Sequence, residues 1–168
     1  RKAASIATRQ VASYERKLGI FFPWDAFDPS LGACAVGEAV QLSSIKDLRF
    51  KSETKDPAQI NEVELIGLDN ITTQSAIAEI NPICEGVKFA RELVSAPPNF
   101  LTPFQMAKEA EKLAAEYNLD LKILDKKECE EQGMGAYLAV AKGSDLEPNF
   151  IHLKYSPKNA KNKVVLIG

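Results

Sequence analysis

Four consecutive apolar residues, Val164 to Ile167, come directly before Gly168 in this sequence. A short run of this kind predicts a strand that is buried on both faces, and such strands belong to parallel sheets covered by helices. In open α/β sheets, ligands and catalytic groups gather just past the carboxyl ends of the strands. The run therefore predicts an α/β fold, and it places the associated chemistry beyond Gly168.

The first 96 residues also alternate between helix and strand patterns. Apolar residues recur near the helical period in three segments, and the segments between them read as short strands. The predicted helices are 1–18, 34–48 and 72–96, and the predicted strands are 19–23 and 62–68. Residues 24–33 read as a loop, Asp56-Pro57 as a turn, and Pro82 predicts a kink or a restart in the third helix.

The clearest local signal is the helix start at Thr102-Pro103-Phe104-Gln105. Thr is a preferred N-cap, Pro suits the first helical position, and Gln105 is placed to complete a capping box. Asp125 and Glu128 predict a second capping box, and Gly133 is placed to end that helix. Strands are predicted at 119–124, 136–144, 150–155 and 164–167, so the predicted order from Thr102 onward is α-β-α-β-β-β.

Composition excludes several classes of partner. The 21 basic and 23 acidic side chains leave a net charge of −2, which gives no electrostatic footprint for nucleic acid or an anionic membrane. No apolar run approaches the roughly 20 residues of a membrane helix. The three cysteines, Cys34, Cys84 and Cys129, are far apart and odd in number, which favours reduced, buried thiols in an intracellular compartment.

Residue chemistry predicts no active site within residues 1–168. The sole histidine, His152, lies in a predicted strand without partners nearby in sequence, so a structural role is favoured over a metal or triad role. Cys129 lies among acidic residues, which raise a thiol pKa and make it a poor nucleophile. The segment 141–145 (AKGSD) could offer backbone amides to an anion, but an ordinary turn is favoured. We therefore expect no catalytic, substrate-binding or metal-binding residue here.

Three motifs carry a resemblance to a known family. They are ARELVSAPPNFLTP (90–103), GMGAYLAVAKGSDLEPNFIHLKY (133–155) and KVVLIG (163–168). In this order and spacing they resemble the leucyl aminopeptidases of peptidase family M17, above all the plant and cyanobacterial branch. The similarity is good from about residue 84 onward and looser before it, and residues 21–37 depart from the pattern expected of the family.

The resemblance implies a two-domain architecture. Residues 1–71 would be the latter part of a macro-domain-like N-terminal α/β domain, 72–98 a linking helix, and 99–168 the start of the catalytic α/β domain. Family members assemble as homohexamers in the cytoplasm or plastids and remove N-terminal residues, often Leu, from peptides.

The resemblance also implies a di-metal mechanism. Two divalent ions, Mn or Zn, activate a bridging water, and a Lys and an Arg assist the transition state. In the family these groups lie in motifs that begin just after VLIG, so the span 1–168 is expected to end before the metal motifs and to bind no metal itself. The alternative is a non-catalytic binding or interaction module, and the residues that follow Gly168 would discriminate between the two.

Overall fold

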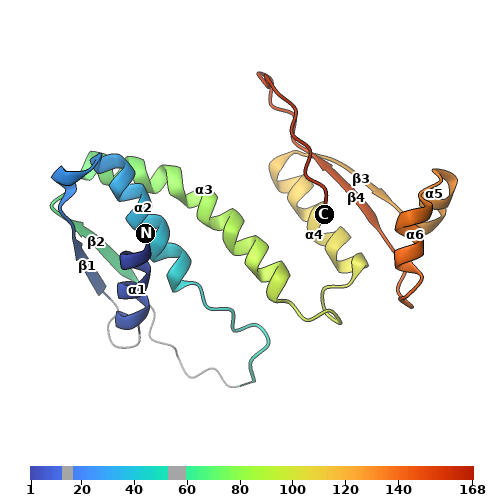
Figure 1. The fold of residues 1–168 in the computed structure, drawn as a ribbon, viewed down its shortest axis with the longest axis horizontal. Helices are drawn as coiled ribbons and strands as arrows, with labels where there is room; N and C mark the ends of the chain where they lie inside the picture. The colour runs from blue at the N-terminus through green and yellow to red at the C-terminus, as the bar shows by residue number, and fades with distance from the viewer. Residues whose placement is uncertain (13–16, 53–59) are drawn as a thin grey trace. The chain divides into compact units, whose positions relative to one another are not determined.

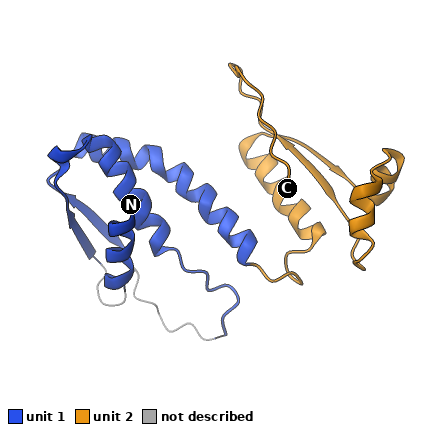
Figure 2. Cartoon of the chain, in the orientation of Figure 1, with its two compact units in different colours: residues 1–95 blue, residues 96–168 orange. Residues whose placement is uncertain are grey.

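A computed structural model describes residues 1–12, 17–52 and 60–168. Contacts along the chain divide it into two compact units, residues 1–95 and residues 96–168 (Figure 2). Both units combine helices with short strands, so the predicted mixed α/β class is confirmed.

The first unit is built around a parallel pair of strands (Figure 1). β1 (Lys17–Phe21) lies beside β2 (Glu62–Ile66), with Lys17 opposite Glu62 and Phe21 opposite Ile66. Parallel neighbours need a crossover connection, and the helix α2 (Pro29–Ser44) lies within it. The helices α1 (Lys2–Val11) and α3 (Asn70–Ser95) both pack against α2, and a short 3-10 helix, η1 (Trp24–Ala26), precedes it.

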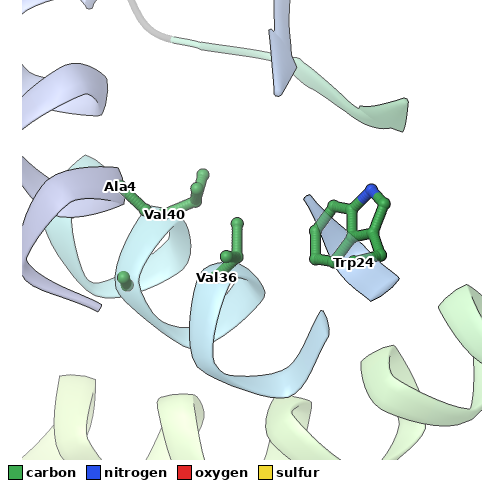
Figure 3. Packing of buried hydrophobic residues seen from close by; sticks show 5 residues of the cluster. Ala4, Trp24, Val36 and Val40 are labelled. Carbon is green, nitrogen blue, oxygen red and sulfur yellow. The ribbon is translucent and has the colours of Figure 1, made fainter. Parts of the chain in front are cut away.

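The core of this unit forms where α1, η1 and α2 meet (Figure 3). Trp24 is 6% exposed, and Phe22, Ile20 and Leu65 pack against the same cluster from the strands and the segment beside them. The buried members of the cluster are Ala4, Trp24, Val36, Ala39 and Val40. Small residues on the helices let them approach closely, so one tryptophan fills much of the remaining space.

Three expectations for this unit need correction. The helix predicted over 1–18 ends at Val11, and its last two residues belong to β1. The predicted loop 24–33 contains η1 and the start of α2, because the Asp28 side chain accepts hydrogen bonds from the Ser30 and Leu31 amides and caps that helix. Of the two outcomes predicted at Pro82, the restart does not occur, because α3 is one helix through this residue, and the kink stays a prediction. Residues 13–16 of the first predicted helix and the predicted turn at Asp56-Pro57 lie outside the described residues.

The second unit pairs two antiparallel strands, β3 (Asp120–Leu124) and β4 (Phe150–Lys154), with Lys122 opposite His152. The helix α4 (Pro103–Tyr117) packs against both strands. Two shorter helices, α5 (Lys126–Glu131) and α6 (Gly135–Ala141), lie between β3 and β4 in sequence (Figure 1). The observed order is therefore α-β-α-α-β, in place of the predicted α-β-α-β-β-β.

Two of the predicted helix starts are confirmed. The Thr102 hydroxyl accepts a hydrogen bond from the Gln105 amide (3.3 Å), although the Gln105 side chain donates to Glu109 and leaves the capping box open. Asp125 and Glu128 form a complete capping box, with both reciprocal bonds at 2.8–2.9 Å. Gly133 follows α5 with a φ of +69°, the left-handed conformation that glycine adopts readily at a helix end.

Two predicted strands are wrong. Residues 136–144 fall mainly in α6, because a short apolar run is ambiguous between strand and helix, and its three alanines favour helix. Residues 164–167 form neither helix nor strand, and their side chains are 77–94% exposed. A strand exists only where a neighbour accepts and donates its backbone hydrogen bonds, and among the described residues no strand pairs with this segment.

Candidate functional site

The sole histidine lies on an exposed strand. His152 sits opposite Lys122 in the antiparallel pair and is exposed to solvent. Across the described ranges 1–12, 17–52 and 60–168, no three His, Cys, Asp or Glu side chains gather closely enough to hold a metal ion. The described residues therefore do not provide the ligand set that a di-metal peptidase requires. The expectation that residues 1–168 bind no metal stays a prediction.

The three cysteines are free thiols, as predicted. Cys84 and Cys129 are buried, as predicted, but the prediction of burial is wrong for Cys34. Cys34 is partly exposed, and its thiol donates to the Glu79 carboxylate at 3.7 Å. Burial raises the pKa of each thiol, and nearby carboxylates raise it further. For Cys129 the carboxylates are those of Asp125 and Glu128. A raised pKa keeps the sulfur protonated, which makes these thiols poor nucleophiles.

Within the segment 141–145, the backbone amides of Lys142, Gly143 and Ser144 already donate hydrogen bonds to carbonyls of α6. The Gly143 N–H donates to the Val140 carbonyl (3.4 Å), and the Ser144 N–H donates to the Ala141 carbonyl (3.1 Å). These bonds form the last turn at the C-terminal end of α6, where exposed carbonyls disfavour anions. The favoured interpretation as an ordinary turn is confirmed, with the difference that the turn follows a helix.

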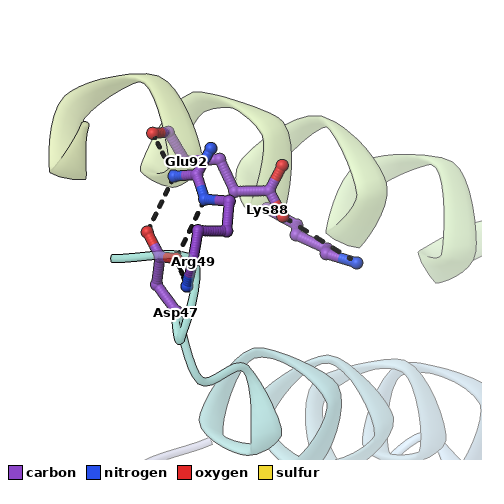
Figure 4. A network of polar contacts seen from close by, with 4 residues as sticks. All are labelled: Asp47, Arg49, Lys88 and Glu92. Atoms are coloured by element: carbon purple, nitrogen blue, oxygen red, sulfur yellow. Dashed lines mark hydrogen bonds and ion pairs between the residues drawn. The ribbon is translucent and has the colours of Figure 1, made fainter. Parts of the chain in front are cut away.

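A charged cluster joins the segment after α2 to the end of α3 (Figure 4). The Arg49 guanidinium donates to both oxygens of Asp47, at 2.9 and 2.7 Å, and also to the Glu92 carbonyl at 2.6 Å. The Lys88 ammonium lies 3.9 Å from the Glu92 carboxylate. The bidentate bond to Arg49 is the main reason why the pKa of Asp47 falls to about 2.

This cluster supplies a hydrogen-bond donor to a backbone carbonyl at the C-terminal end of α3. The Glu92 carbonyl is among the last four of α3, which have no amide partner within the helix. A cation is also favoured at this end by the helix dipole. The neighbouring Arg91 donates to the carbonyl of Leu42, in the last turn of α2, at 2.8 Å. The two arginines therefore hold the end of α2 and the segment after it against the last turns of α3.

The cavity beside this cluster has a volume of about 430 Å³. Ile45, Leu48 and Ser95 line it together with the charged side chains. Asp47, Arg49 and Glu92 are engaged with one another or with the backbone, so the arrangement serves to hold two segments together. Sequence reasoning missed this arrangement, since the only feature predicted between the second helix and the strand 62–68 is the turn at Asp56-Pro57.

A larger, apolar cavity of about 570 Å³ lies against α1, β1 and α2. Ala7, Phe21, Phe27 and Leu31 line it, and Phe21 and Leu31 remain 76% and 69% exposed. Asp28 and Arg1 also line the cavity, but the Asp28 carboxylate caps α2 and the Arg1 guanidinium forms an ion pair with Glu38 at 2.8 Å. The cavity therefore offers apolar contact area and no group positioned for bond-breaking chemistry.

Comparison with known proteins supplies the assignment that the side chains do not. A model of the cytosol aminopeptidase family, catalytic domain, matches residues 88–168, which places this part of the chain among the peptidases. The whole chain is 48% identical to a probable cytosol aminopeptidase of Prochlorococcus marinus and 43% identical to another of Nostoc punctiforme. The chain belongs to the cytosol aminopeptidase family, peptidase family M17.

Solved structures agree with this assignment. A mutant of tomato leucine aminopeptidase is 30% identical over 95% of the chain, with a TM-score of 0.77. The bottromycin maturation enzyme BotP, in complex with Mn, is 26% identical over 93% of the chain, with a TM-score of 0.75. The chain spans about a third of each of these proteins, 34% of the two curated relatives and 32–33% of the two solved chains.

Proposed function

We propose that residues 1–168 are one segment of an aminopeptidase that releases N-terminal residues, with leucine preferred, from peptides. The observation that carries this proposal is the 48% identity over the whole chain to a probable cytosol aminopeptidase. The resemblance implies that two divalent ions, Mn or Zn, serve the reaction, and BotP, in complex with Mn, is a structural neighbour that supports this choice. Their ligands would come from parts of the full-length protein outside residues 1–168.

In this proposal the segment is scaffold. Residues 1–71 belong to the N-terminal domain, 72–98 form the linking helix, and 99–168 open the catalytic domain. The hydrogen bonds of several polar side chains support a scaffolding role. Asp28, Thr102 and Asp125 cap helices, and Arg49 donates to a carbonyl at a helix end. Side chains that are committed to capping bonds are poorly placed to bind substrate or metal.

The decisive experiment compares the full-length protein with residues 1–168 alone. We expect the full-length protein to hydrolyse a leucyl anilide, to lose activity with a chelator, and to recover it with Mn²⁺ or Zn²⁺. The 168-residue chain should hydrolyse nothing under the same conditions. Metal-dependent turnover by the purified chain would overturn the scaffold role. A full-length protein that stays inactive with either metal would favour a non-catalytic binding module.

Assembly and location are part of the same proposal. By the resemblance, the full-length protein forms a homohexamer in the cytoplasm or in plastids, with peptides as substrates and without nucleic acid or membrane as partner. Among the described residues, no helix has the length and apolar character needed to cross a membrane. Light scattering coupled to size exclusion would test the hexamer, since a stable monomer or dimer of the full-length protein would contradict it.

A further inference from the structure

One apolar stripe runs along most of α3. Its members are spaced alternately four and three residues apart, so they share one side of the helix. They are Ala76, Ile80, Ile83, Val87, Ala90 and Val94. A stripe of this width and regularity normally packs against a neighbour along its whole length.

The first half of the stripe has its neighbour. Ala76 and Ile80 are 2% and 3% exposed, and they pack towards α2. The contact is close, because a Cβ atom built on Gly37 of α2 would lie only 2.6 Å from the Ile80 Cδ1 atom. α2 ends at Ser44. The Leu42 carbonyl in its last turn accepts a hydrogen bond from Arg91, and Arg49 in the segment after α2 donates to the Glu92 carbonyl. Arg91 and Glu92 are outside the stripe.

Within the described part of the first unit, nothing covers the second half of the stripe. Ile83 is 51% exposed, Val94 is 86% exposed and Ala90 is also exposed, while Val87 is partly buried. Gly86, next to the stripe, has no atom within 4 Å of the place where its Cβ would lie. Exposed apolar side chains are ordinary when scattered, but a contiguous row on one helix side marks a surface that another segment covers.

The family match indicates which segment that is. The match to the catalytic-domain model begins at residue 88, inside α3, although contacts place the whole of α3 in the first unit. The last two turns of α3 thus belong to the catalytic domain by sequence and to the first unit by packing. The relatives are about three times as long as this chain, so two thirds of such a protein lies outside the structure.

We propose that Ile83, Val87, Ala90 and Val94 form an internal docking face, covered in the full-length protein by an apolar part of the catalytic domain outside residues 1–168. This inference rests on the proposal that the chain is a segment of a longer aminopeptidase. α3 then acts as a shared element, with α2 seated on its first half and the catalytic domain on its second half.

Thiol labelling tests this proposal without an activity readout. Val94→Cys introduces a thiol in the docking face, and Ile71→Cys introduces one at an equally exposed position on the same helix but outside the stripe (86% and 83% exposed). Each variant is made both in the full-length protein and in residues 1–168, and is then exposed to a maleimide. Peptide mass mapping separates labelling at the introduced thiol from labelling at Cys34, Cys84 and Cys129. Ala90→Cys repeats the test at a smaller side chain.

In residues 1–168, the thiols at positions 94 and 71 should react at similar rates. In the full-length protein, labelling at positions 90 and 94 should slow by about tenfold or more, because a covered thiol reacts only when the structure opens, while labelling at position 71 stays unchanged. Equal labelling at both sites in the full-length protein would overturn the proposal, and so would equal protection of position 71. Protection that appears in the 168-residue chain as its concentration rises would assign the face to a second copy. An inactive full-length protein leaves this readout intact, so the two proposals fail separately.

Discussion

The indole N–H of Trp24 donates a hydrogen bond to the backbone carbonyl of Ile66 over a distance of 2.8 Å. This bond links η1 to the last residue of β2, across 42 positions of sequence. The same ring lies 3.4 Å from the places where Cβ atoms on Gly32 and Gly67 would sit. The single side chain of Trp24 therefore connects the helices of the first unit with its strands.

Trp24→Ala should destabilise the first unit by about 3–5 kcal/mol, the usual effect of truncating a large buried aromatic side chain. Trp24→Phe keeps an aromatic ring and loses the hydrogen bond, so a loss of about 1 kcal/mol beyond its smaller buried area is expected. Denaturant unfolding followed by far-UV circular dichroism measures both, since the sole tryptophan is the residue replaced. Phe27→Ala, at a ring 60% exposed, serves as control and should change stability by less than about 1 kcal/mol.

Thr102→Ala should destabilise the second unit by about 1 kcal/mol, because the Gln105 amide loses its acceptor at the start of α4. Thr102→Ser keeps the hydroxyl and should retain most of the stability. Pro103→Ala should matter less than Thr102→Ala, because proline contributes preorganisation and no hydrogen bond. Equal denaturant midpoints for Thr102→Ala and the unmodified chain would show that this bond does not hold the helix start.

Two helix starts show what the sequence can reveal about the fold. Thr102-Pro103 predicts an N-cap followed by proline, and the structure has that cap. Asp28-Pro29 carries the same signal and starts α2 in the same way, yet the glycine, proline and aspartate clustered around it favour a loop. Local capping chemistry is therefore sufficient to find both helix starts, provided that it is weighed above the composition of the segment.

Contacts between residues far apart in the chain could not be predicted from local sequence patterns. The bond from Arg49 to the Glu92 carbonyl joins residues 43 positions apart, and no local pattern specifies that pairing. Val164–Ile167 has the composition of a buried strand, but strand formation depends on a partner strand and not on composition alone. The family's metal motifs, which the resemblance places beyond Gly168, are the reason why no metal site is predicted from residues 1–168.

Gly37 of α2 and Gly86 of α3 should respond differently to replacement by alanine. Gly86→Ala should stabilise α3 by about 0.5–1 kcal/mol, since a Cβ there meets no atom within 4 Å and alanine favours helix. Gly37→Ala gains the same propensity but places its Cβ 2.6 Å from the Ile80 Cδ1 atom. Its net effect should be less favourable than that of Gly86→Ala. Combining it with Ile80→Val, which removes that methyl group, should relieve the clash, and a double-mutant cycle without coupling would contradict this contact.

The Asp47–Arg49 pair should make stability depend on pH in acid. The pKa of Asp47 is lowered to about 2, below the value of about 3.9 for a free aspartate. The ionised carboxylate therefore stabilises the fold above pH ~4, and this contribution is lost as the pH falls towards 2. The unmodified chain should have a higher denaturant midpoint than Asp47→Asn at pH 5, and the difference should shrink on acidification. A difference that stays constant from pH 5 to pH 2 would contradict the pairing.

Exposure of Val164–Ile167 should make the isolated 168-residue chain associate. Each of the four side chains is at least 77% exposed, and contiguous apolar surface favours contact between molecules. Extended segments with unpaired backbone groups can also pair with a second copy. Light scattering at increasing concentration should report oligomers for the unmodified chain and fewer for the double variant Val164→Lys, Leu166→Lys. The control Ser156→Lys, Asn159→Lys adds the same charge to the neighbouring polar segment and should leave association nearly unchanged. A monodisperse monomer with strong amide protection at 164–167 would instead indicate that this segment folds onto its own chain.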